Sequence, residues 1–194
     1  FIMGKENLLP QEVEKALNKA SGILGITEKY TDRRDVSQAA EKGDERARLA
    51  IEVEAYRIKK YIGSYLAALG RIDAVVFTAG VGEMNPAIRG AALSGLEGLG
   101  IRFDPRKNAL ARTRNAETVI STEASPVKIF VIPTDEELRM TEDTEALLVG
   151  TYRPHTGFTY SFQSREYANG ERAEALAQEL KDRPQLAEVI ARLP

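Results

Sequence analysis

The sequence of 194 residues predicts an α/β fold. Three observations predict it. A long stretch of helical periodicity over residues 44–69 comes first, and a short apolar run over residues 72–78 follows it. Two further apolar runs, at 118–122 and 127–132, precede another helical segment. An order of helix, strand, helix, strand, strand and helix with at least one long crossover is typical of α/β domains.

The first forty residues predict short helices joined by loops. Pro10 suits the first position of a helix that runs to about residue 19. Residues 21–26 (SGILGI) indicate a turn and a short extended piece, and residues 27–35 (TEKYTDRRD) a polar loop. A helix is expected from near Ser37 to Gly43, with Asp35 as its cap and Gln38 at the third helical position.

A long helix is predicted over residues 44–69, where Gly70 ends it. Its apolar residues recur three and four positions apart, which places them on one face that packs on a core or on a partner. They are Ala47, Ile51, Ala55, Ile58, Ile62, Leu66 and Leu69.

The middle of the chain predicts a strand, a turn and a helix. Residues 72–78 (IDAVVFT) are an apolar run with valines, as in a buried strand. Residues 79–83 (AGVGE) predict a glycine turn. Pro86 then begins a helix to about residue 99, which Gly100 caps, and residues 101–103 predict a short strand.

The last part of the main body combines a loop, two strands and a helix. Residues 104–116 are polar and predict a loop before the strands at 118–122 and 127–132. Pro133 ends the second strand. Thr134 and Glu137 match a capping box for a helix that reaches about residue 149.

The composition changes after residue 150, so we expect a domain over residues 1–150 and a C-terminal extension over 151–194. Residues 151–163 are rich in aromatic side chains and predict a strand-like piece. Residues 171–192 predict two short helices that Pro184 separates. This extension is expected to pack on the main body.

Composition excludes several classes of function. A net charge of −2 argues against a nucleic-acid surface, which needs a strong excess of basic residues. The absence of cysteine excludes disulfides and thiolate chemistry, and it fits a cytoplasmic protein. The single histidine, His155, receives no role. No apolar run approaches 18 residues, so no transmembrane helix and no membrane partner are predicted.

The glycine turn after the first strand is the strongest local candidate for a ligand site. Glycines let a ligand approach the backbone closely, and a helix N-terminus favours phosphate. A plain tight turn between strand and helix explains the same residues, because a GxG pattern alone is weak.

Two charged segments are further candidates. Asp32, Arg33 and Arg34 precede a helix, where arginines stack on a base or pair with phosphate. Solvated arginines beside a helix cap remain the alternative. Residues 135–137 are three acids at a helix start, where they complement the helix dipole or offer a ligand to Mg²⁺.

The order of segments resembles that of the acetate kinases over roughly residues 8–150. The segments are TDRRD, AYRIKKYIGSYLAALG, DAVVFTAGVGE, GLEGLGI and VKIFVIPTDEEL. The resemblance implies a ribonuclease-H-like (actin-like ATPase) α/β domain that forms the C-terminal half of a two-domain kinase. It also implies reversible phosphorylation of acetate to acetyl phosphate by ATP, with Mg²⁺ or Mn²⁺ as cofactor.

The resemblance assigns site residues as well. It implies that Glu136 serves the metal and that two segments hold ATP or ADP: Asp32, Arg33 and Arg34, and Gly80, Val81, Gly82, Glu83 and Met84. The chain departs from many relatives at Arg33, where an aromatic residue is usual, at Met84, where asparagine is usual, and at Asp135, where asparagine is usual.

The family's catalytic acid, histidine and two arginines are expected upstream of Phe1, in a missing N-terminal half. The chain is therefore expected to hold no catalytic residue and to be inactive alone. The resemblance also implies a homodimer through this half. Two alternatives stay open: a propionate or butyrate kinase, and a non-catalytic module that binds nucleotide or assembles with a partner.

Overall fold

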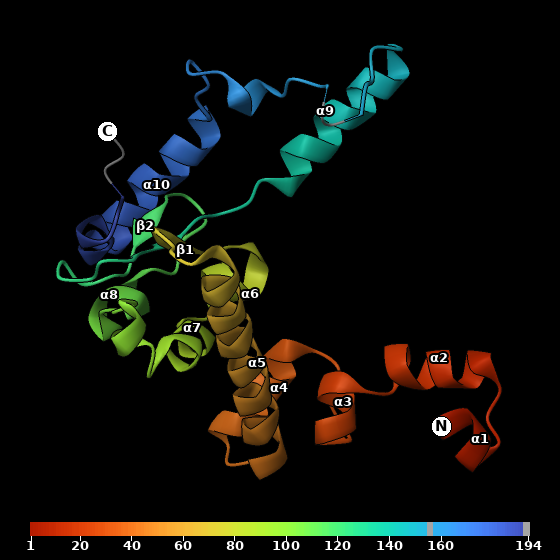
Figure 1. The fold of residues 1–194 in the computed structure, drawn as a ribbon. Coiled ribbons are helices and arrows are strands. Elements are labelled where there is room, and N and C mark those ends of the chain that lie inside the picture. The colour runs from red at the N-terminus through yellow and green to blue at the C-terminus, as the bar shows by residue number, and fades with distance from the viewer. Residues whose placement is uncertain (155–156, 192–194) are drawn as a thin grey trace. The chain divides into compact units, whose positions relative to one another are not determined.

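The computed structural model describes residues 1–154 and 157–191, and His155 lies outside them (Figure 1). The chain forms two compact units, Phe1–Gly70 and Arg71–Pro194. In the described part of the chain, no helix has both the length and the apolar character needed to cross a membrane.

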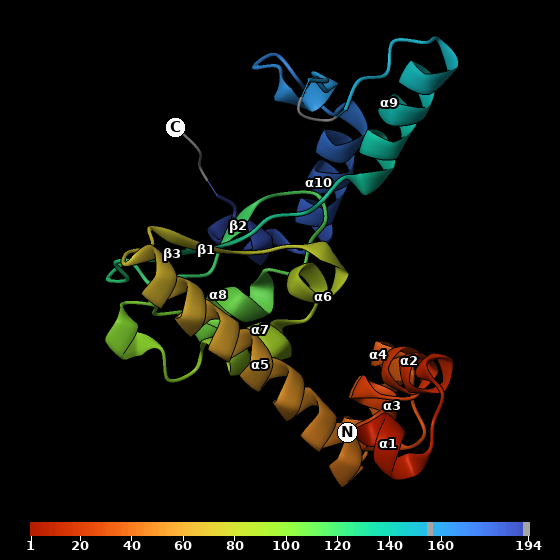
Figure 2. The ribbon, with the colours of Figure 1, turned by 45° about the vertical axis from the view of Figure 1, so that its right-hand side comes forward.

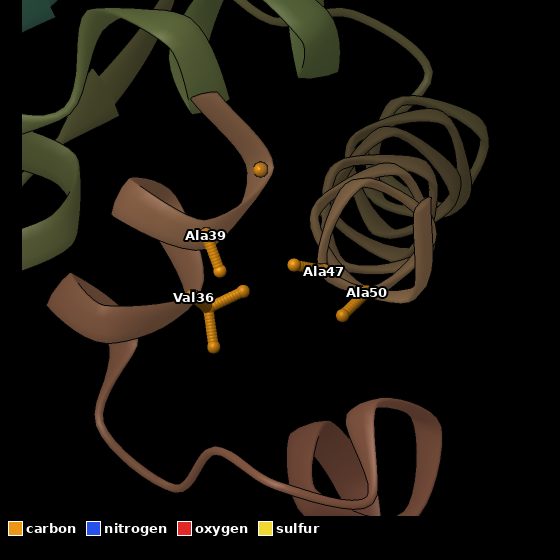
Figure 3. Close-up of a cluster of buried hydrophobic side chains, with 5 residues drawn as sticks. Val36, Ala39, Ala47 and Ala50 are labelled. Atoms are coloured by element: carbon orange, nitrogen blue, oxygen red, sulfur yellow. The ribbon is translucent and has the colours of Figure 1, made fainter. Parts of the chain in front are cut away.

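The first unit is helical. Its elements are α1 (Ile2–Glu6), α2 (Pro10–Lys19), α3 (Gly22–Thr27), α4 (Arg33–Glu41) and α5 (Glu45–Leu69). Small side chains of α4 and α5 form its core, because alanines let the two helices approach closely (Figure 3). The core residues are Val36, Ala39, Ala40, Ala47 and Ala50.

The sequence predictions for this unit need two corrections. Residues 21–26 are not extended, because Ile23 and Ile26 share one side of helix α3 and pack against the core of α4 and α5. Helix α4 begins at Arg33 rather than near Ser37, and Asp32 caps it instead of Asp35. The Asp32 carboxylate accepts a hydrogen bond of 2.7 Å from the Arg34 backbone nitrogen.

Helix α5 follows its prediction closely. The carboxylate of Asp44 accepts from the backbone nitrogen of Ala47 at its start. Gly70 ends it with a φ of 72°, which favours glycine. The predicted stripe is buried at Ala47 and Ala55, whereas Leu69 at the end is 67% exposed.

The second unit contains a small sheet of β1 (Ala74–Phe77), β2 (Thr118–Val119) and β3 (Lys128–Val131). In the described residues the strand order is β1-β3-β2. Strands β1 and β3 are parallel, with Ala74 beside Lys128 and Phe77 beside Val131, and β2 is antiparallel to β3. The long crossover predicted from the sequence is confirmed, and residues 101–103 contribute only isolated bridges.

The helices of this unit correct three further predictions. Residues 79–84 form α6 (Ala79–Met84) rather than an open turn. The helix that begins at Pro86 is α7 (Pro86–Leu93), so it ends before the predicted residue 99. The 3-10 turn η1 (Glu97–Leu99) follows it. The predicted loop at 104–116 contains α8 (Pro105–Leu110), because the carboxylate of Asp104 caps it.

The helix after β3 is α9 (Glu136–Leu148), and its cap also differs from the prediction. Asp135 caps it through a 3.0 Å bond from the Leu138 nitrogen. Thr134 is not part of a capping box, since its donors bind Glu83 instead.

The C-terminal segment folds as part of the second unit. It contains η2 (Ser161–Gln163) where a strand-like piece was expected, and α10 (Gly170–Asp182) and η3 (Pro184–Glu188) where two helices were expected. Figures 1 and 2 show α10 close to the edge of the sheet at β2. Leu186 and Val189 are buried, and the Val119 nitrogen donates to the Val189 carbonyl at 2.8 Å.

Candidate functional site

A polar cavity of about 530 Å³ lies where β1 and β3 end. Gly80 and Glu83 reach it from α6, and residues 134–137 reach it from the start of α9. The carboxyl ends of parallel strands are the usual place for ligands in open α/β sheets. Three of the predicted site residues, Gly80, Glu83 and Glu136, therefore meet at one cavity.

The lining of this cavity does not include the other predicted residues. Val81, Gly82 and Met84 belong to α6 but are not among the residues that line this cavity. Asp32, Arg33 and Arg34 belong to the first unit.

The two glycines of α6 differ in their surroundings. A Cβ atom added at Gly82 would lie 3.3 Å from the backbone carbonyl carbon of Phe77, a tight contact that would require the end of β1 to shift by a few tenths of an ångström. A Cβ atom at Gly80 would meet no atom within 4 Å. The backbone at Gly80 is thus open for the close approach of a ligand.

Arg89, on the following helix α7, holds α6 in place. It is fully buried, and its Nη1 donates to the carbonyls of Gly82 and Glu83 at 2.7 and 2.8 Å. Its Nη2 and Nε donate to Asn108 O, Ala111 O and Asn108 Oδ1, each at 2.8 Å. Burial, together with the charge of Arg112, lowers the pKa of Arg89 to about 10, so the guanidinium is charged at neutral pH.

Sequence reasoning missed Arg89. A usable indication was present in the sequence, because Arg89 stands three and four residues before the apolar Ala92 and Leu93, which places it near the apolar face of the predicted helix.

Glu83 connects α6 to the acidic segment. Its side chain is buried, with 3% of the residue exposed. Its Oε1 accepts from the Thr134 backbone nitrogen at 2.9 Å and from the Thr134 hydroxyl at 3.0 Å. The carboxylate thereby fixes the chain just before Asp135 and Glu136.

The acids at the start of α9 suit a magnesium ion that a phosphate also binds. Glu136 and Glu137 are exposed in the first turn, and both line the cavity. No cluster of three or more His, Cys, Asp or Glu among the described residues is placed to hold a metal alone. Magnesium commonly takes one or two carboxylates together with substrate phosphates and water, so this donor set fits it.

Cationic and amide side chains complete the lining. Arg114 and Asn115 come from the loop before β2, and Asn169 and Arg172 come from the start of α10. Arg172 Nη2 pairs with Glu117 at 2.8 Å. No sequence pattern predicts that this loop and the C-terminal segment meet at the same site.

The charged segment of the first unit is internally paired. Arg34 donates to the Asp32 carboxylate from Nε at 3.1 Å and from Nη2 at 2.7 Å, and these bonds lower the pKa of Asp32 to about 2. Arg33 is only 16% exposed and lies 2.6 Å from Glu54. Burial raises the pKa of Glu54, and the charge of Arg33 opposes that shift.

Comparison with known proteins identifies the family. A family model for the Acetokinase family matches residues 1–142. The chain belongs to the acetokinase family.

Similarity within the acetokinase family is high over this chain. The acetate kinase of Treponema pallidum is 59% identical over 98% of the chain and 43% of its own length, so the similarity includes most of residues 151–194. The acetate kinase of Trichlorobacter lovleyi is 59% identical over 86% of the chain and 40% of its own length. The chain thus spans less than half the length of these curated relatives.

Solved structures agree with the predicted α/β fold. The acetate kinase of Porphyromonas gingivalis matches with a TM-score of 0.69 and 41% identity, over 76% of this chain and 37% of that one. A propionate kinase of Francisella tularensis matches with a TM-score of 0.62, also at 41% identity, over 70% of this chain and 34% of that one.

Proposed function

We propose that this chain is the C-terminal, nucleotide- and metal-binding half of an acetate kinase. The whole enzyme would transfer the γ-phosphoryl group of ATP to acetate, reversibly, to form acetyl phosphate and ADP. The observation that carries the proposal is the cavity at the ends of β1 and β3. It combines the open backbone of Gly80 with the carboxylate of Glu136, in a chain of the acetokinase family.

Each predicted residue has a proposed role. The α6 segment from Gly80 through Val81, Gly82, Glu83 and Met84 would bind the nucleotide, with the phosphates against the open backbone at Gly80. Asp32, Arg33 and Arg34 would serve the adenosine side. Glu136 would hold Mg²⁺ or Mn²⁺, which when bound spreads the charge of the phosphate oxygens.

The reaction needs residues beyond this chain. Phosphoryl transfer depends on positioning the acceptor and on cations around the transferred group. The chain spans 43% of its Treponema relative, and we propose that an N-terminal half of the whole enzyme supplies these groups. The exposed apolar side chains of Met140, Leu147 and Leu148 on α9, and of Val149 just after it, support a surface that such an N-terminal half would cover.

We further propose a homodimer through α5. Tyr56, Tyr61 and Tyr65 on this helix are each more than half exposed, and aromatic side chains are enriched in protein interfaces. We keep the division into a domain over 1–150 and an extension over 151–194 as part of this proposal. We also place the enzyme in the cytoplasm, where its substrate ATP is available.

A second candidate is a kinase for propionate or butyrate. It is favoured by one observation: among the solved structures, a propionate kinase and an acetate kinase each match this chain at 41% identity. Phosphorylation rates of the complete enzyme with acetate, propionate and butyrate in competition would separate the two.

Calorimetric titration of the 194-residue chain with Mg·ATP tests the proposal. We expect saturable binding that Glu136→Gln weakens, and no formation of acetyl phosphate from acetate. Glu145→Gln on the same helix is the matched control, because Glu145 is exposed and does not line the cavity. If the chain does not bind Mg·ATP, assembly with a partner remains as its function. If the chain alone forms acetyl phosphate, the reaction does not need the N-terminal half that we propose.

A further inference from the structure

Helix α10 is anchored to the loop that lines the cavity. Glu179 accepts from the Thr113 hydroxyl at 2.6 Å and from the Asn115 side chain at 2.9 Å through the same oxygen. Arg183 donates to the carbonyls of Leu110 and Arg112 at 2.9 and 2.8 Å. The extension therefore determines where Arg114 and Asn115 stand.

The end of the extension is tied to the sheet as well. The Ala191 nitrogen donates to the Glu117 carbonyl at 2.8 Å, and Ile190 forms a bridge with Thr118. These bonds continue the sheet beyond β2. Helix α10 is thus held in place within the second unit, and we call its side that lines the cavity the wall.

Arg172 stands on this wall with an unused donor. The Arg172 side chain is 31% exposed, and its Nη2 pairs with Glu117. Its Nε is shielded from solvent and donates to no acceptor among the described residues. A donor that is shielded from solvent is also shielded from a ligand, so a contact to a ligand oxygen falls to the part of the Arg172 side chain that stays exposed in the cavity.

The charges around the cavity fit a ligand that carries both signs. The acids at the start of α9 suit a cation, and Arg114 and Arg172 suit an anion. Arginine is well suited to phosphate because its planar guanidinium offers several donors in a fixed arrangement.

We propose that α10 is an anion-binding wall of this cavity and that Arg172 contacts the phosphate oxygens of the ligand. The ligand class, a nucleoside di- or triphosphate with a divalent cation, rests on the proposed function. The residue and its wall lie outside the 142 residues that the family model matches.

Calorimetric titrations of the 194-residue chain with Mg·ATP, Mg·pyrophosphate and adenosine test this wall. Arg172→Ala should weaken Mg·ATP and Mg·pyrophosphate about tenfold and leave adenosine unchanged, because the lost contact is to phosphate. Arg172→Lys should recover part of the affinity. Arg165→Ala is the control, since it removes the same charge from the extension without touching the cavity lining.

The outcomes separate this wall from the proposed function. If Arg172→Ala binds Mg·ATP as tightly as the wild type, Arg172 does not contact the phosphates, and the proposed kinase function is unaffected. An equal loss for adenosine would also overturn the phosphate contact, because Arg172 would then act only through folding. If the chain binds Mg·pyrophosphate through Arg172 but does not bind Mg·ATP, the phosphate contact of Arg172 is supported and the kinase function is contradicted. Failure of the wild type to bind either ligand would overturn both.

A second measurement avoids any variant that fails to fold. Phenylglyoxal modifies accessible arginines, and mass spectrometry reads each site in the unaltered chain. Mg·pyrophosphate should protect Arg172 and leave Arg165 reactive. Equal modification of Arg172 with and without Mg·pyrophosphate would overturn the proposal.

Discussion

Glu83 Oε1 accepts two hydrogen bonds from Thr134, one from its backbone nitrogen at 2.9 Å and one from its hydroxyl at 3.0 Å. The two residues are 51 positions apart in the chain. One buried carboxylate therefore joins the helix that follows β1 to the residue that precedes Asp135 and Glu136. The spacing of the open backbone and the acids at the cavity depends on this connection.

Removal of the carboxylate should destabilise the second unit. Glu83→Ala leaves the Thr134 nitrogen without its acceptor, which costs about 1–3 kcal/mol in the free energy of unfolding. Urea denaturation followed by circular dichroism measures the loss. Glu83→Gln is the control, since its amide oxygen keeps an acceptor in place. Equal stability of Glu83→Ala and Glu83→Gln would show that the two bonds contribute nothing.

Arg89 should be the most sensitive single position of this unit. Arg89→Met removes five hydrogen bonds and leaves the carbonyls of Gly82, Glu83, Asn108 and Ala111 without this donor. We expect a loss of at least about 3 kcal/mol in the free energy of unfolding, with faster amide exchange in α6. Arg71→Met, at a side chain that is 84% exposed, should change stability by less than about 0.5 kcal/mol. A similar small change at Arg89 would contradict its role as the support of α6.

Acid should loosen the start of α4 through Asp32. The hydrogen bonds from Arg34 lower the pKa of Asp32 from 3.8 to about 2. Because the folded value is the lower one, the ionised group stabilises the folded state above pH 3.8, and this contribution is lost as the pH falls toward 2. Titration of the Asp32 side-chain carbon by NMR should show a midpoint near 2, and Arg34→Ala should return it toward 3.8. An unchanged midpoint in Arg34→Ala would exclude Arg34 as the cause.

The sequence predicted the elements whose evidence is local. Helix α5 and strands β1 and β3 follow from periodicity and apolar runs, and Gly43 and Gly70 mark helix ends with positive φ. The predicted start of α4 was wrong because Asp32 and Asp35 are both suitable N-cap residues. The burial of Val36, Ala39 and Ala40 decides for Asp32, and that burial depends on α5.

The prediction of a turn at residues 79–83 was wrong for the same reason, since contacts with distant residues decide the structure there. Helix α6 contains two glycines, so its sequence indicates a turn, and it is supported by Arg89 from α7. The sequence placed Gly80 and Glu136 each shortly after a strand, and the structure brings both to one cavity, while their roles stay a prediction. It gave no sign of Arg172, because that residue reaches Glu117 across 55 positions and through a segment outside the family match.

The two glycines of α6 offer a test that separates folding from binding. Alanine is the better helix former by about 1 kcal/mol, so Gly80→Ala should keep or slightly raise the free energy of unfolding, since its Cβ atom meets nothing within 4 Å. Gly82→Ala places a Cβ atom 3.3 Å from the backbone of Phe77, which β3 holds in place. We therefore expect it to be less stable than Gly80→Ala by about 1–3 kcal/mol.

The order reverses for ligand binding. A methyl group at residue 80 fills the open space through which we propose that the nucleotide phosphates approach, so Gly80→Ala should lose affinity for Mg·ATP although its fold is intact. Calorimetric titration and urea denaturation of the same two proteins give both quantities. Wild-type affinity in a stable Gly80→Ala protein would show that the ligand does not approach the backbone there. The glycine would then serve neither packing nor binding, and the proposed nucleotide site would have to lie away from the start of α6.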